Sequence, residues 1–186
     1  MKSNFLSSVT LTVLCIVLFI VIYSVVMLGI AQLAPNKGHG FVIQDNDKTY
    51  YENIAQNFTN AEYFWSRPSA VNYNSAGSGG SNKGPSNPDY LATVQARIDT
   101  FMVYNPGIQK SEIPSDLVTA SGSGQDPNIS VQAAKVQIKR IALARNISEE
   151  KINQLIADQT EKPLLGLFGT EKLNVLKLNI ELDNLK

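Results

Sequence analysis

The residue types that most often carry out catalysis are few in this sequence and do not form a recognisable set. The 186-residue chain has one histidine, His39, and one cysteine, Cys15. His39 lies between two glycines and Cys15 lies inside a long apolar run, so neither has the partners that a Ser-His-Asp triad or a zinc site needs. Asp116 and Asp126 have the chemistry for acid or base catalysis, but aspartates beside loops are commonly solvated turn residues. These residues argue against an independent enzyme.

Three stretches imitate chemical motifs without completing them. Asp47-Lys48-Thr49 copies the start of the phosphorylated Asp-Lys-Thr-Gly-Thr sequence of P-type ATPases, but Tyr50 occupies the glycine position. Ser148 and Lys151 have the Ser-x-x-Lys spacing of penicillin-interacting enzymes, yet the accompanying Ser-Asp-Asn and Lys-Thr-Gly motifs are missing. The glycine-rich stretches lack the Gly-x-x-x-x-Gly-Lys order of a phosphate-binding loop. We therefore expect no directly bound cofactor and no metal.

Charge excludes a further class of function. The chain has 16 basic and 16 acidic residues, which provide no basic surface for nucleic acid. With its single cysteine in the apolar run, the polar part of the chain cannot be stabilised by disulfides. Its stability must come from burial of apolar side chains.

The apolar run from Phe5 to Leu33 is the element on which the rest depends. A helix of that length measures about 43 Å, more than the roughly 30 Å hydrocarbon core of a bilayer. It is too long for a cleavable signal peptide, so we expect an uncleaved, single-pass anchor. Basic residues on its two sides nearly balance, and the short leader favours an inside N-terminus and an exported domain. The predicted parts are a cytoplasmic tail over residues 1–4, a transmembrane helix over 5–33 and an extracytoplasmic domain over 34–186.

The patterns after the anchor predict a mixed domain. Asn87 and Pro88 provide a cap and a first helical residue. Residues 176–182 alternate strictly between apolar and polar types, which is typical of a half-buried strand. Helices and strands follow each other without a repeating unit, so the fold class is α+β. The predicted elements are a hairpin over residues 41–51, helices over 88–104, 131–142 and from Ser148 onward, strands over 117–120 and 176–182, and a turn over 163–169.

Two loops rich in Ser, Gly and Asn, over residues 71–87 and 121–128, follow an aromatic segment over residues 56–70. Loops this long are usually functional or disordered. The aromatic segment either closes the end of the core, with Arg67 capping carbonyls, or forms a contact surface, because aromatic and arginine side chains dominate interfaces. The residues that we expect to form a partner interface, or to shape these loops, are Gln56, Asn57, Phe58, Phe64, Arg67, Pro68, Ser78, Gly79, Gly80, Ser81, Asn82, Ser121, Gly122, Ser123, Gly124 and Asp126.

The same segments carry a resemblance to a known family. In order along the chain they are Gln56-Asn57-Phe58-Thr59, Tyr63-Phe64, Arg67-Pro68-Ser69-Ala70, Ser78-Gly79-Gly80-Ser81-Asn82, Val118-Thr119-Ala120-Ser121-Gly122-Ser123-Gly124 and Asp126-Pro127. Together with one N-terminal membrane helix, this set resembles the C subunit of the bacterial Kdp-type potassium-transporting ATPase over nearly the whole chain. The sequence departs from the family at Gln125, Asn128 and Val131, where Leu, His and Pro are common.

The resemblance implies a non-catalytic accessory subunit of a high-affinity, ATP-driven potassium uptake pump in the bacterial inner membrane. The implied partners are a channel-like subunit that selects potassium, a catalytic P-type ATPase subunit, a small single-helix subunit and membrane lipid, with no nucleic acid. ATP and K⁺ would be bound by the complex, and this subunit would assist ATP binding indirectly. From the residues alone, two alternatives remain: a membrane-anchored periplasmic hydrolase that uses loop Ser and Asp residues, and an anchored module that binds a soluble ligand.

Overall fold

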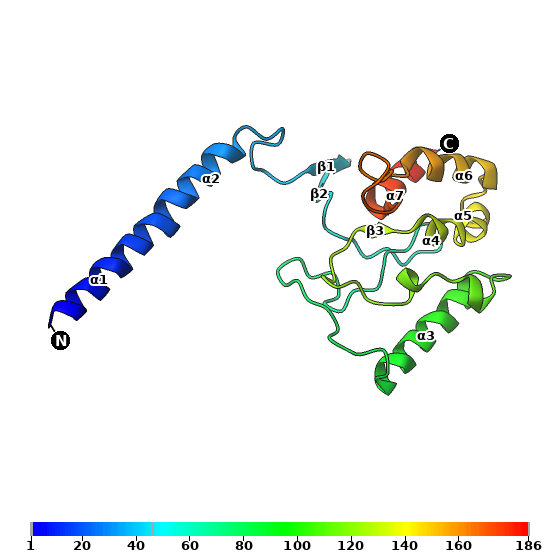
Figure 1. Ribbon diagram of the computed structural model, residues 1–186. Coiled ribbons are helices and arrows are strands. Elements are labelled where there is room, and N and C mark those ends of the chain that lie inside the picture. Colours follow the sequence, from blue (N-terminus) through cyan, green and yellow to red (C-terminus); the bar gives the residue numbers. More distant parts are fainter. Residues whose placement is uncertain (1, 46, 186) are drawn as a thin grey trace. The chain divides into compact units, whose positions relative to one another are not determined.

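The computed structural model describes residues 2–45 and 47–185, which fall into two compact units that divide between Phe41 and Val42 (Figure 1). The first residue of the predicted tail, Met1, and the residue at the tip of the predicted hairpin, Asn46, lie outside the described residues.

The first unit is one long helix followed by turns over residues 32–39. The helix consists of α1 (Lys2–Ile16), a π-helical segment η1 (Val17–Ile22) and α2 (Tyr23–Ala31). The stretch Asn4–Ala31 is long and apolar enough to span a membrane, which confirms that the apolar run is a candidate membrane span. Its large apolar side chains are exposed, as they must be in a helix that contacts lipid or another helix.

The second unit contains three elements that the sequence predicts correctly. β1 (Val42–Asp45) and β2 (Lys48–Tyr51) pair as an antiparallel hairpin. The helix α3 (Pro88–Tyr104) begins where its cap predicts, because the Asn87 side chain accepts a hydrogen bond from the Tyr90 N–H. Ser148 caps α6 (Glu149–Gln159) in the same way.

The predicted strand over residues 176–182 is wrong, because this stretch belongs to the helix α7 (Val175–Asn184). Four of its five buried residues, Val175, Leu178, Asn179 and Leu182, follow a spacing of three and four, which is helical. The Asn174 side chain accepts a bond from the Lys177 N–H and starts the helix. Alternating leucines fit both periods, and here the cap and the buried face decide for the helix.

Two further predictions need correction. Residues 117–120 form no strand. Leu117 ends the short 3₁₀ turn η3 (Ser115–Leu117), which comes after a similar turn, η2 (Lys110–Glu112), and residues 118–120 are irregular. The predicted helix over residues 131–142 is divided into α4 (Val131–Lys135) and α5 (Ile138–Arg145). The division falls at Val136 and Gln137, where the buried Gln137 side chain donates to the Ala133 carbonyl and the Gln137 N–H bonds to the Ala134 carbonyl.

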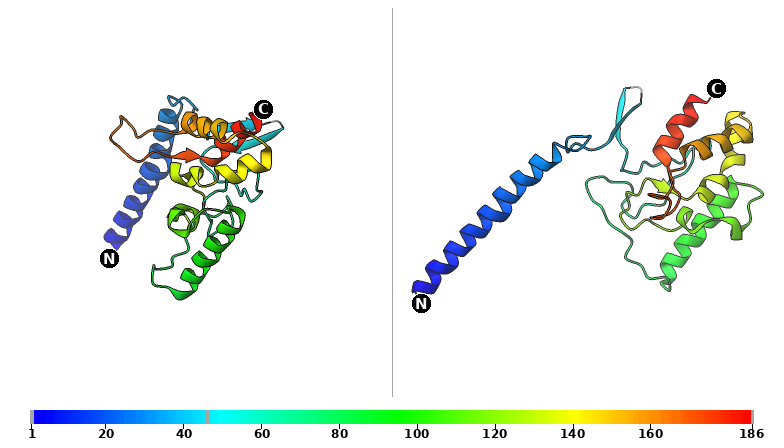
Figure 2. Two further views of the ribbon diagram at one scale, coloured as in Figure 1. Left: turned by 90° about the vertical axis from the view of Figure 1, so that its right-hand side faces the viewer. Right: turned by 45° about the horizontal axis from the view of Figure 1, so that its top comes forward.

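The core of the second unit is mainly helical. α6 packs against α4, α5 and α7, and Figure 2 shows α6 and α7 close together and α3 apart from them. The only other pairing between strands of the described chain is between β3 (Asn128–Ile129) and β4 (Leu173–Asn174), which are antiparallel. The fully buried Phe64 joins this core, and Phe58, Tyr63 and Trp65 pack against it. The prediction that the aromatic segment closes the core is confirmed.

Candidate functional site

The two Ser/Gly loops of the second unit are bonded to each other. We refer to the contact between residues 68–80 and 121–125 as the loop clasp. The Gly79 N–H donates to the Ser123 carbonyl at 2.8 Å, and the Ser78 hydroxyl donates to the same oxygen at 3.0 Å. These bonds join segments that are some 45 residues apart in sequence.

A second pair of bonds closes the other end of the clasp. The Ser121 N–H donates to the Pro68 carbonyl at 3.1 Å. The Ser69 hydroxyl donates to the Gly124 carbonyl at 2.7 Å, and the same hydroxyl oxygen accepts bonds from nearby N–H groups of its own loop. The bonds of the clasp therefore run mainly through backbone groups, which is why small residues occupy it.

Gly124 shows how tight the clasp is. Its φ is +68°, and a Cβ placed on it would lie 2.6 Å from Val71 Cγ2 and 2.8 Å from the Gly79 carbonyl oxygen. A Cβ on Gly80 would lie 3.0 Å from the Gly122 carbonyl oxygen. A larger residue at Gly124 would thus push the two loops apart and would also strain its own backbone.

We expect Gly124→Ala to lower the free energy of unfolding by roughly 2 kcal/mol or more, because it combines positive φ with steric overlap. Gly122→Ala is the matched control, since nothing lies within 4 Å of a Cβ there and its φ is not in the left-handed region. Urea unfolding of both purified variants, followed by circular dichroism, measures the difference. Equal midpoints for the two variants would contradict the steric argument.

An ion pair lies beside the clasp. Arg67 Nη1 is 2.6 Å from Asp126 Oδ2, with a quarter to a third of each side chain exposed, so the pair contributes about 1 kcal/mol or less. Arg67 thus pairs with a carboxylate instead of capping carbonyls. The other oxygen of Asp126 accepts bonds from the Asn128 N–H and amide. Asp116 likewise accepts bonds from the Ser130 N–H and hydroxyl, just before α4. Both aspartates therefore hold loops in place.

An aromatic cleft of about 460 Å³ lies next to the clasp, between residues 57–73 and α3. The Trp65 ring contacts Tyr104 at a centroid distance of 5.1 Å. Its indole N–H donates to the Asn60 carbonyl, and the Tyr73 hydroxyl donates to the Arg67 carbonyl. Burial raises the pKa of Tyr73 above its ordinary value of 10.0, so this hydroxyl stays protonated at neutral pH. The polar ends of both side chains are engaged internally.

The structure places the predicted residues in three groups. Those in or next to the clasp are Ser78, Gly79, Gly80, Ser121, Gly122, Ser123, Gly124 and the Arg67–Asp126 pair, and those that line the cleft are Asn57, Phe58 and Pro68. Phe64 is buried in the core, Gln56 bonds within its own segment, and Ser81 and Asn82 lie beyond the bonds of the clasp. Whether these residues contact a partner stays a prediction.

The sequence reasoning missed Arg97 and Tyr104, although their spacing of seven along α3 places them on one helix face.

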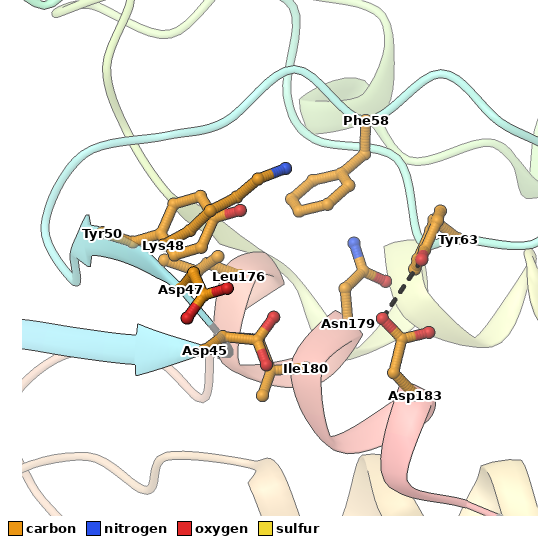
Figure 3. Close-up of a pocket in the computed structure, with 10 residues that line it drawn as sticks. All are labelled: Asp45, Asp47, Lys48, Tyr50, Phe58, Tyr63, Leu176, Asn179, Ile180 and Asp183. Atoms are coloured by element: carbon orange, nitrogen blue, oxygen red, sulfur yellow. Dashed lines mark hydrogen bonds between the residues drawn. The ribbon is translucent and has the colours of Figure 1, made fainter.

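A second pocket, of about 430 Å³, lies between the hairpin and α7 (Figure 3). Asp45, Asp47 and Lys48 line one side, and Asp183 of α7 accepts a bond from the Tyr63 hydroxyl at 3.1 Å. Burial and this bond raise the pKa of Tyr63. Within residues 2–45 and 47–185, no group of three His, Cys, Asp or Glu side chains has a geometry suited to a metal ion.

Comparison with known proteins gives a match along nearly the whole chain. Residues 5–184 match the model of the KdpC family, described as K+-transporting ATPase, c chain. The potassium-transporting ATPase KdpC subunit of Flavobacterium psychrophilum is 56% identical over 184 residues, covering 98% of this chain and 99% of the relative. The corresponding subunits of Flavobacterium johnsoniae and Bacteroides fragilis are 53% and 48% identical, with at least 97% of each chain covered.

Proposed function

Because this chain belongs to the KdpC family of K+-transporting ATPase c chains, we propose that it is a non-catalytic accessory subunit of a high-affinity, ATP-driven potassium uptake pump. The observation that carries the proposal is the end-to-end match, which includes both the N-terminal apolar helix and the second unit. In this role the subunit assists assembly and ATP-coupled K⁺ transport, while ATP and K⁺ are bound by other subunits.

The second unit supports a role in binding a partner. The loop clasp is held together by two backbone bonds and by two serine hydroxyls that donate to backbone carbonyls, so its shape is fixed by bonds within the chain. The aromatic cleft beside it offers ring faces whose polar ends are already engaged within the chain. Ordered aromatic surfaces of this kind lose little conformational entropy on binding. The partners are a channel-like subunit and a catalytic P-type ATPase subunit, together with a small single-helix subunit.

The membrane helix sets the location in this proposal. The helix anchors the chain in the bacterial inner membrane, with the N-terminus inside and the second unit outside. Support for the anchor comes from the length and apolar composition of the stretch Asn4–Ala31. The hydroxyls of Ser8 and Thr12 donate to carbonyls one turn earlier, which satisfies them within the helix.

The proposal predicts that the tagged full-length chain, purified in mild detergent from cells grown at low potassium, brings a large multi-spanning ATPase with it. The attached complex should hydrolyse ATP in response to K⁺. A tagged single-span protein of the same membrane is the control for nonspecific recovery. Recovery of the chain alone, as a monomer, would contradict the proposal and favour an anchored hydrolase or ligand-binding module.

A further inference from the structure

The turn over residues 163–169 of the second unit exposes large apolar side chains. Leu164, Leu165, Leu167 and Phe168 are 69%, 80%, 79% and 65% exposed. We refer to residues 164–168 as the apolar tip. Single exposed leucines are ordinary on protein surfaces, but a contiguous group on one short turn marks a contact site.

The backbone of the tip is unusual for its sequence. The Leu167 N–H donates to the Leu164 carbonyl at 3.1 Å, and the two residues between them, Leu165 and Gly166, have φ of +55° and +72°. Turns with two positive φ values strongly favour Asn-Gly or Asp-Gly, because a bulky side chain is strained there. Leucine at position 165 therefore disfavours the turn that holds it. Its side chain also gains nothing from burial within the chain, so an external contact accounts for its presence.

Backbone hydrogen bonds at the base of the tip fix its shape. Leu164 and Phe168 exchange two backbone bonds of 3.0 Å, and Glu161 and Lys172 exchange two more at the base. An ion pair of 3.3 Å joins the Glu161 and Lys172 side chains, and Lys177 of α7 lies 3.9 Å from the same carboxylate. An apolar group that is already ordered binds at a small entropic cost.

The residues around the tip favour a protein partner over lipid. The four nearest charged residues along the chain are Glu161, Lys162, Glu171 and Lys172, two acidic and two basic. Segments that bind lipid surfaces usually carry excess Lys and Arg and interfacial Trp or Tyr, which are absent from residues 161–172. An apolar centre with a balanced charged rim is the arrangement of protein interfaces.

We propose that the apolar tip inserts into an apolar pocket on another subunit of the pump, with Leu165 as its central contact. This inference rests on the proposed function, because it takes the partner from the same complex. Residues 164–168 take no part in the bonds of the loop clasp, so the tip adds a contact that the clasp residues do not provide.

The test is Leu165→Asn in the tagged full-length chain, coexpressed with the other subunits and purified in detergent. Asn suits positive φ, so the variant should unfold at the same temperature as the wild type or higher, while recovery of partner subunits falls about tenfold or more. Leu165→Gly, which fits the same turn, should lose partners equally. Leu143→Asn is the matched control, since Leu143 on α5 is 81% exposed and should keep its partners.

The outcomes separate this inference from the proposed function. If the wild-type chain brings no ATPase subunit, the proposed function fails, and the inference fails with it. If the wild type recovers its partners and Leu165→Asn recovers them equally, only the inference is overturned. A tip that contacts lipid would give this second result in detergent. A tip that contacts a second copy of this chain would instead change the mass of the chain purified without its partners, which also overturns the inference.

Discussion

Arg140→Met is expected to lower the free energy of unfolding by on the order of 4 kcal/mol, because it leaves several buried acceptors without donors. Arg140 is 5% exposed, and its guanidinium donates to the Asn105 and Gln137 side chains and to carbonyls within residues 60–63. It also lies 4.5 Å from the centre of the Trp65 ring. One side chain therefore joins α5, the end of α3 and the aromatic segment.

The charge of Arg140 is stabilised by these oxygens and by the ring. Burial lowers its pKa to about 10, still well above neutral, so it is charged at pH 7 in both the folded and the unfolded chain. Its contribution to stability is therefore constant near neutral pH. The lowered pKa reflects a desolvation cost that the hydrogen bonds must offset, which explains why removal of the donors is so damaging.

Urea unfolding, followed by the fluorescence of Trp65, the single tryptophan, measures this effect directly. Lys139→Met is the matched control, because Lys139 is the exposed neighbour on the same helix. Arg140→Lys should fall between the wild type and Arg140→Met, since an ammonium cannot reach as many acceptors as the planar guanidinium. If Arg140→Met proved as stable as Lys139→Met, the contacts of Arg140 would not contribute the stability that we expect.

Asn179→Leu is expected to cost about 3 kcal/mol, although the two side chains are similar in size. Asn179 is 1% exposed, and its amide pairs with both backbone groups of Phe64: the Phe64 N–H donates to Oδ1 at 2.9 Å, and Nδ2 donates to the Phe64 carbonyl at 3.0 Å. Leucine would fill the space but leave a buried N–H and a buried carbonyl unpaired, at about 1–3 kcal/mol each.

The same substitution at Asn184, which is exposed on the same helix, provides the control and should be nearly neutral. Thermal unfolding of Asn179→Leu and Asn184→Leu in parallel measures the difference. A hydrogen-exchange experiment adds a local test, because the Phe64 amide should lose protection in Asn179→Leu alone. Unchanged protection of that amide would show that water or another group replaces Asn179.

Local signals explain which elements the sequence predicts. Asn87 with Pro88, and Ser148 with its following glutamates, fix the starts of α3 and α6 within a few residues, whatever the rest of the chain does. The α7 error has the opposite cause. Leu176, Leu178 and Leu182 fit the strand pattern. The Asn174 cap and the buried face decide for the helix, and that face includes Asn179, whose burial becomes visible only when its partner, Phe64, is in place.

The candidate site is harder to predict because its bonds join backbone groups of distant segments. Residues 60–65 are irregular, with Phe64 buried among them, and their backbone bonds to the side chains of Gln137, Arg140 and Asn179 instead of a neighbouring strand. No local pattern encodes such pairings. The two loops were recognisable as unusual from their composition, but their union in the loop clasp depends on the shape of the folded chain.

The loop clasp also closes a loop in the chain between its two sides. Because Gly80 lies against Gly122, residues 81–121 form a loop whose two ends meet at the clasp, and this loop carries α3, which packs on the core through Phe101. Formation of the clasp already includes the entropic cost of closing this loop. The docking of α3 on the core then requires only a rearrangement of residues within the loop. Extra residues inserted at the exposed Gly84 would lengthen this loop without separating its ends. The loop can therefore differ in length while the core of the domain stays the same.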